Sequence, residues 1–123
     1  MPMTVNWHEG ASTLFTGLDN FEPYTKQAIE ELMLNYAIKM VEYAKANAPW
    51  NDRTGSARAG LDADVTDRGD QLVLSLFHTV EYGIFLEVRW GAAYAIILPT
   101  IETLGPDLMS EFNDLISGII YYE

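Results

Sequence analysis

The chain has no cysteine and only two histidines, His8 and His78, far apart in the sequence. The first absence excludes a disulfide framework and thiolate chemistry, and it is compatible with a reducing compartment. Neither histidine has a second histidine or a cysteine nearby to complete a metal site. The motifs of zinc proteases, phosphate-binding loops, dinucleotide domains and serine hydrolases are also missing. We therefore expect no enzyme, no metal and no cofactor, and for His78 a plain surface or hydrogen-bonding role.

Basic residues are scarce as well: 7 lysines and arginines stand against 18 acidic residues, for a net charge of −11. Proteins that bind nucleic acids neutralise phosphates with Lys and Arg, so specific nucleic-acid binding is not expected. No apolar run approaches the ~18 residues that a membrane-spanning helix needs, and we expect no membrane segment. The simplest interpretation of the acidity is that it keeps a small protein in solution.

A length of 123 residues indicates one domain, with residues 1–20 as an N-terminal arm, 21–118 as the core and 119–123 as a C-terminal tail. Within the arm, Thr4-Val5-Asn6-Trp7 suggests one short strand. The tail is apolar for a chain end, so it either packs on the core or inserts into a partner.

Helical periodicity is strongest from Tyr24 to Asn47. The apolar residues that recur at helical spacing are Ile29, Leu32, Met33, Tyr36, Met40, Tyr43 and Ala44. A second row, Leu34, Ile38 and Val41, lies beside the first, which indicates either a broad core face or a neighbouring molecule. From Pro99 onward the pattern is helical again, with an expected interruption at Gly105-Pro106 and a fresh helix start at Pro106.

Between these helices the pattern changes to a period of two. Leu61, Ala63 and Val65 alternate with polar residues, 67–70 has turn chemistry, and Gln71 to His78 is a second strand, so the pair predicts a β-hairpin. Asp62 and Asp64 are more typical of a solvated face than of a cation site. The segment 82–88 is ambiguous between strand and helical turn. The fold class that we predict is α+β, with a long N-terminal helix and a C-terminal helix packed on a small antiparallel β-sheet.

The loop that follows the first helix concentrates scarce positive charge, because it holds Arg53 and Arg58 close to Thr54-Gly55. Arginines in an acidic protein suggest pairing with carboxylates. Glu87, if buried, needs such a partner, and an arginine would match it, either within the subunit or between subunits. Trp50 and Trp90 lie in predicted loops, and large aromatic residues are enriched at interfaces.

Two blocks carry a resemblance to a family. The first is Ala48-Pro49 at the end of the helix, followed by Arg53-Thr54-Gly55-x-x-Arg58-x-Gly60-Leu61; the second is Tyr82-Gly83-Ile84-Phe85-Leu86-Glu87, then Gly91 and Tyr94 to Ile101. In this order, and over roughly Tyr24 to Ser117, the chain resembles the tail-completion (head–tail joining, neck) proteins of long-tailed bacteriophages. In the common form of the family, Gly-Thr directly follows the Glu-aromatic pair. This chain departs from that form, because it has Val88-Arg89-Trp90-Gly91 at the same place.

The resemblance implies a structural virion protein that is assembled in the host cytoplasm and forms a homo-oligomeric, hexameric ring at the head–tail junction. Its partners would be a head-closure protein and a tail-tube or tail-terminator protein, and DNA would pass through without specific binding. An acidic surface near such a conduit would repel the DNA. The residues that we expect in oligomer or partner contacts are Trp50, Arg53, Thr54, Gly55, Arg58, Tyr82, Glu87 and Trp90. The alternative function is a small acidic regulatory or inhibitor domain that binds a basic protein.

The charge balance generates a first prediction. The protein should not bind duplex DNA at about 0.15 M salt, because too few Lys and Arg are present to release counterions from phosphates. A mobility-shift titration measures this. A micromolar or tighter complex would mean that the basic residues form an exposed patch, and it would favour a DNA-binding module.

Overall fold

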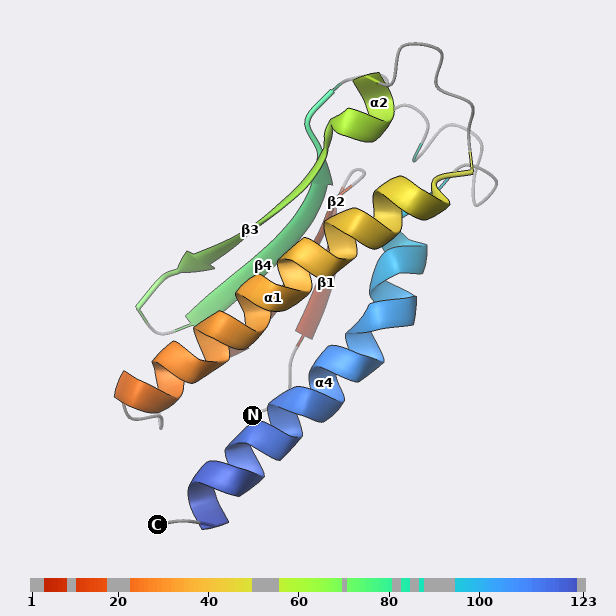
Figure 1. Ribbon diagram of the computed structural model, residues 1–123. Helices are drawn as coiled ribbons and strands as arrows, with labels where there is room; N and C mark the ends of the chain where they lie inside the picture. Colours follow the sequence, from red (N-terminus) through yellow and green to blue (C-terminus); the bar gives the residue numbers. More distant parts are fainter. Residues whose placement is uncertain are drawn as a thin grey trace.

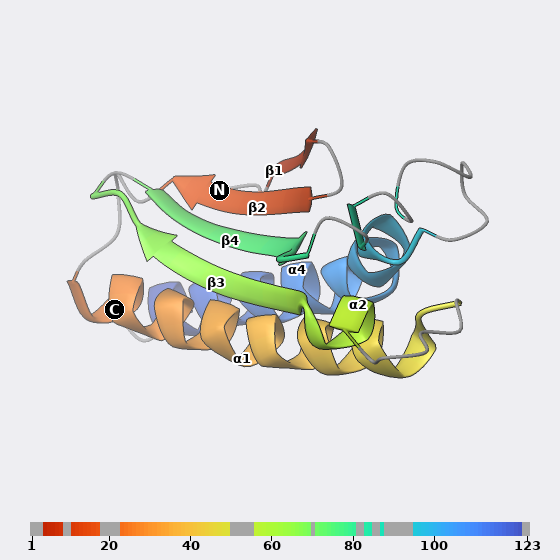
Figure 2. The same cartoon turned by 90° about the horizontal axis from the view of Figure 1, so that it is seen from above.

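The computed structural model describes residues 4–8, 11–17, 23–49, 56–69, 71–80, 83–84, 87 and 95–121, with side chains for 26–49, 57–69, 71–80, 83–84, 87 and 95–116. These residues form a four-stranded antiparallel sheet with two long helices on one of its faces (Figures 1 and 2). The elements in chain order are β1 (Thr4–His8), β2 (Ala11–Gly17), α1 (Pro23–Asn47), α2 (Ser56–Ala59), β3 (Leu61–Asp67), β4 (Gln71–His78) and α4 (Ile97–Tyr121). The predicted α+β class, with helices packed on a small antiparallel sheet, is confirmed.

The N-terminal hairpin extends the sheet. β1 pairs with β2, and β2 pairs with β4, which gives the strand order β1-β2-β4-β3. Residues 1–20, which we expected as an arm with one short strand, therefore contain two strands of the sheet. β4, the second partner of β2, lies far along the chain, so no local pattern in the first twenty residues predicts this pairing.

The predicted hairpin of β3 and β4 is confirmed, with a register that runs from Leu61 opposite His78 to Asp67 opposite Leu72. Gly69 has a φ of 85° in the turn, a conformation that glycine adopts without steric cost. Its N–H donates to Asp67 Oδ1 at 2.8 Å, and Lys26 Nζ lies 2.9 Å from Asp67 Oδ2. The backbone hydrogen bond from Gly69, followed by the contact with Lys26, lowers the pKa of Asp67. The turn is thus tied to the first turns of α1.

α1 confirms the predicted helix and buries one face against β3, β4 and α4. Its buried residues are Ile29, Met33, Tyr36, Ala37, Met40 and Ala44. The hydroxyl of Tyr36 donates to Glu111 on α4, which links the two long helices. α1 ends at Asn47, two residues before Pro49, as expected from the bias of proline against a preceding helical residue.

The expected break at Gly105-Pro106 is wrong, because α4 is one helix of 25 residues with Pro106 inside it. A proline in a helix interior costs about 3 kcal/mol, since it lacks the N–H for the carbonyl four residues earlier. The buried stripe of α4 nevertheless runs through this point without a change of phase, by way of Ile97, Ile101, Leu108 and Phe112. Full burial of each such side chain is worth about 1.5–3 kcal/mol, so together they outweigh the proline.

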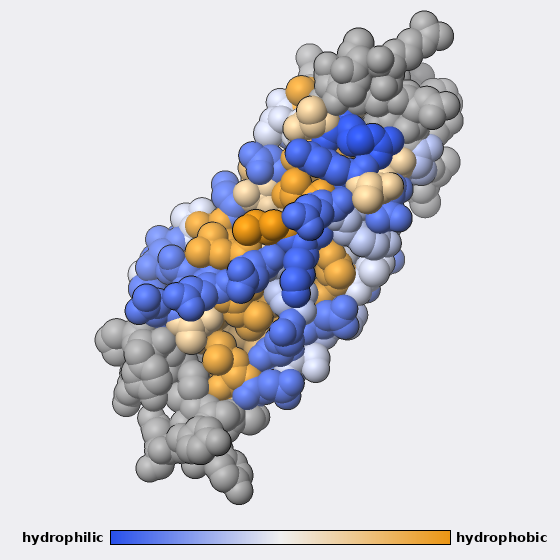
Figure 3. All heavy atoms as spheres, in the orientation of Figure 1, coloured by the Kyte–Doolittle hydropathy of each residue, from blue (hydrophilic) through white to orange (hydrophobic). Residues whose placement is uncertain are grey.

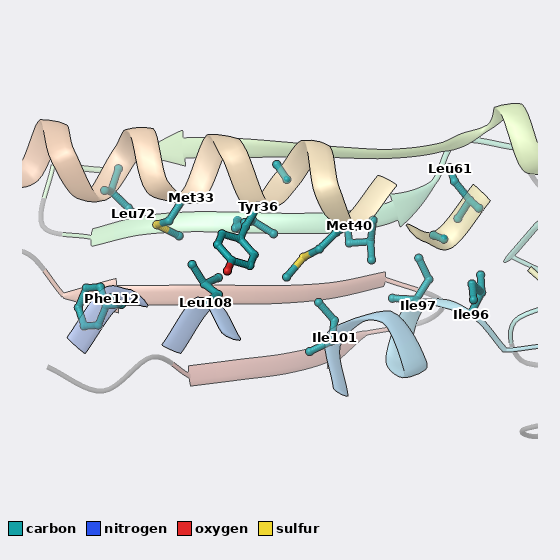
Figure 4. Packing of buried hydrophobic residues seen from close by; sticks show 14 of the residues in the cluster. Met33, Tyr36, Met40, Leu61, Leu72, Ile96, Ile97, Ile101, Leu108 and Phe112 are labelled. Carbon is teal, nitrogen blue, oxygen red and sulfur yellow. The ribbon is translucent and has the colours of Figure 1, made fainter. Parts of the chain in front are cut away.

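The core fills the space between the helices and the sheet (Figure 4). Side chains from both long helices and from the sheet meet there, among them Met33 and Met40 of α1, Leu61 of β3, Leu72 of β4, and Ile101, Leu108 and Phe112 of α4. Of the predicted α4 stripe, Leu115 and Ile116 are partly buried against this core, and the side chain of Ile119 lies outside the described residues.

A continuous α4 generates a second prediction. Gly105 is buried in the helix, and a Cβ added there would meet Ile101 Cγ2 at 3.8 Å as its nearest neighbour, an ordinary contact. Gly105→Ala should therefore raise the free energy of unfolding by about 0.5–1 kcal/mol, because alanine loses less backbone entropy in a helix. Urea denaturation measures the change. A neutral or destabilising result would indicate a helix interrupted at this position.

Candidate functional site

The site is built at the end of β4, where the inward face of the strand finishes in a polar residue. Leu72, Leu74 and Leu76 face the helices and are fully buried, and His78 continues this alternating row at 6% exposure. Of the two roles expected for His78, the surface role is wrong and the hydrogen-bonding role is confirmed. A buried imidazole needs a polar partner, because an unpaired polar group in the interior is costly.

That partner is Glu87. His78 Nε2 lies 2.9 Å from Glu87 Oε1, and both side chains are completely buried. With Nε2 as donor the bond is charge-assisted and stronger than a neutral one. We expected an arginine beside this carboxylate, and the structure places a histidine there.

The same carboxylate binds the first backbone N–H groups of α4. Ile96 N lies 3.0 Å from both carboxylate oxygens, and Ile97 N lies 3.0 Å from Oε2. The first N–H groups of a helix have no partner within the helix and carry partial positive charge, which a carboxylate stabilises. The residue before α4 is Ile96, whose side chain cannot accept a hydrogen bond. Glu87 therefore supplies, from a distant position, the cap that the local sequence lacks.

Two glycines let the backbone pack closely at this end of β4. A Cβ on Gly83 would lie 2.6 Å from His78 Nδ1, so no larger residue fits without moving the imidazole. A Cβ on Gly60 would meet Thr79 Oγ1 and Val80 Cγ2 at 3.0 Å, and the Gly60 carbonyl accepts bonds of 2.7 Å from both Thr79 N and Thr79 Oγ1. We call Gly60, His78, Thr79, Gly83 and Glu87 the motif junction.

Arg58 lies in α2, next to the motif junction in the sequence, and is partly buried. Its guanidinium donates to the carbonyl of Lys45, and to that of Ala48 at 3.3 Å. The last carbonyls of a helix lack partners within the helix and carry partial negative charge, so a cation stabilises them. Arg58 thus docks α2 onto the end of α1.

Of the eight residues expected in oligomer or partner contacts, only Arg58 and Glu87 belong to the described part of the chain. Both bind backbone groups at helix ends within the subunit. Outside the described residues lie Trp50, Arg53, Thr54, Gly55, Tyr82 and Trp90.

The chemistry of the motif junction is structural. The His78 and Glu87 side chains have no solvent exposure, so the pair orients three chain segments and presents no reactive atom at the surface. Among the residues with described side chains, no group of three or more His, Asp or Glu is arranged to hold a metal ion. No helix in the described ranges combines the length and apolar character that crossing a membrane requires.

Two features of the sequence indicate this arrangement, although our sequence analysis did not use them. The alternation of β4 places His78 on the same face as Leu72, Leu74 and Leu76, which predicts a buried imidazole. The apolar start of α4 lacks any Ser, Thr, Asp or Asn to cap it, which predicts a cap from elsewhere. Glu87, nine residues before Ile96, satisfies both needs.

The cap generates a third prediction. Glu87→Gln should lower the free energy of unfolding by about 3 kcal/mol, because a neutral amide cannot replace a carboxylate that accepts from His78 and two backbone N–H groups. Chemical denaturation near neutral pH measures the loss. The matched control is Glu102→Gln, an exposed residue of α4, where the change should stay within about 0.5 kcal/mol. Equal effects of the two substitutions would contradict the capping role.

No model of a protein family matches the chain, and no curated protein or solved structure is significantly similar to it. The resemblance to the phage tail-completion proteins therefore stays a prediction that depends on the two motif blocks.

Proposed function

We propose that this chain is a structural protein of a bacteriophage neck, whose subunits form a ring at the head–tail junction through which DNA passes. The observation that supports this most is the convergence of the two motif blocks. Gly60 from the first block and Gly83 and Glu87 from the second pack around the same end of β4. The two motif blocks are far apart in the sequence, but their residues meet at one place in the structure. This shared place gives a structural reason for the two blocks to occur in the same chain.

The chemistry of the described part is that of a building block. Its most buried polar cluster fixes the positions of α2, β4 and α4, and Arg58 fixes the end of α1. Within the second motif block, two large apolar residues are exposed: Ile84 at 37% and Leu98 at 40%. A ring needs contacts between different surfaces of neighbouring subunits, and exposed apolar side chains supply their energy. The net charge of −11 suits a passage that DNA must not adhere to.

The alternative, a small acidic regulatory or inhibitor domain, is favoured by a different observation. Asp62 and Asp64 are both exposed along β3, which gives one strand an acidic surface that suits a basic partner. Such a domain would act as a single subunit.

The state of assembly discriminates between the two functions and is a fourth prediction. Light scattering after size exclusion, with electron microscopy of the same fractions, should find closed rings with the mass of a hexamer of 13.8 kDa subunits. Leu98→Gln should shift the protein toward single folded subunits, because it removes an exposed apolar contact at the start of α4.

The matched control is Ile38→Gln on α1, which should leave the rings intact. A monodisperse single subunit at every concentration, with or without the substitutions, would contradict the ring and favour the acidic binding domain.

A further inference from the structure

Within the described sheet, β3 has one free edge, since its only partner strand is β4. At the two ends of their ladder, Thr79 N donates to the Gly60 carbonyl at 2.7 Å, and Arg68 N donates to the Gln71 carbonyl at 2.9 Å. In an antiparallel pair, every second residue bonds to the partner and the residues between point away from it. The backbone groups of Ala63 and Val65 therefore point toward the free edge.

Beneath this edge lies an apolar row of α1. Leu34 is 44% exposed and Ile38 is 59% exposed, although both belong to a helix whose opposite face is buried. Together with β3 they line a groove of about 360 Å³, whose walls are Leu34, Ala37, Ile38, Val41, Glu42, Asp62, Ala63 and Asp64. Figure 3 shows apolar surface on the side of α1 that faces β3, between polar residues.

The rim of the groove is acidic. Asp62, Asp64 and Glu42 line it, and all three are exposed. Two copies that paired through their β3 edges would bring these carboxylates together, and like charges on opposing strands are destabilising. Ala63 N–H donates to Asp62 Oδ1 at 2.8 Å in the free subunit, a bond that any added strand has to replace. The charge favours a cationic occupant.

We propose that the free edge of β3 and the groove beside it bind an extended basic segment of a partner protein, which adds to the sheet as a further strand. Backbone bonds to Ala63 and Val65 give the register. The side chains of an added strand alternate between the two faces of the sheet. Those on the helix side reach Leu34 and Ile38, so they must be apolar. Those on the other side lie next to Asp62 and Asp64, so they must be lysine or arginine.

The partner segment is defined by its alternating apolar and basic residues. Its binding does not depend on whether the subunits form a ring. The bound segment would be the neighbouring molecule that covers the second apolar row of α1. Ile84 and Leu98 stay available for contacts between subunits.

The test uses the full chain and a labelled peptide of alternating valine and lysine. Fluorescence anisotropy gives its affinity, and amide exchange by NMR gives the site. We expect slower exchange at Ala63 and Val65, and binding about tenfold weaker for a peptide with the same residues in two blocks. N-methylation of the peptide along one edge should abolish binding, since it removes backbone donors and keeps every side chain.

The substitution Ile38→Gln should lower the affinity for the alternating peptide by about tenfold. Leu98→Gln should change that affinity by less than about twofold. Equal affinity for the alternating and block peptides would mean attraction by charge alone and would overturn the proposal, as would unchanged binding of the N-methylated peptide. Self-association that is lost in Ile38→Gln would assign the face to a second copy instead. Rings that survive Ile38→Gln while peptide binding is lost would separate this site from the ring contacts.

Discussion

The buried carboxylate of Glu87 ties the start of α4 to the end of β4, and the placement of that helix depends on it. α4 begins among apolar residues that offer its first N–H groups no partner of their own, and Glu87 binds two of them while it also binds His78. In surroundings that exclude water, such bonds are strong when complete and costly when one partner is missing. The start of the helix that covers β2 and packs on α1 is therefore held by one side chain outside it.

The sequence predicted those elements whose signals are local. α1 and the hairpin of β3 and β4 follow from periodicity, turn residues and Pro49, and the structure confirms them. The pairing of β2 with β4 could not be predicted, because the two strands are distant in the chain. The continuity of α4 through Pro106 could not be predicted either, because the local penalty of proline is outweighed by burial that only the folded core provides. For the site, the sequence selected Glu87 and Arg58, but it predicted an arginine beside Glu87 where the structure has His78, and it did not predict the backbone carbonyls that Arg58 binds.

Both charged residues bind helix ends, which the sequence alone did not indicate. Glu87 binds backbone amides at the start of α4, and Arg58 binds the carbonyl of Lys45 in the last turn of α1 and that of Ala48 just after it. A helix end carries partial charge that no single residue displays, so a residue-by-residue search overlooks it. Arg58 and Glu87, one from each motif block, thus bind the two long helices at opposite termini.

The strand order also sets the sequence of events in folding. The hairpin of β3 and β4 closes through a turn of a few residues, but β2 meets β4 only after the chain has closed a loop that contains α1, α2 and β3. Loop closure costs entropy before any contact repays it, so distant pairings form late. During that interval β4 has an open edge where β2 will bind. β1 and β2 are thus synthesised before β3 and β4 but join them late, and the newly made chain depends on the hairpin of β1 and β2 to close that edge.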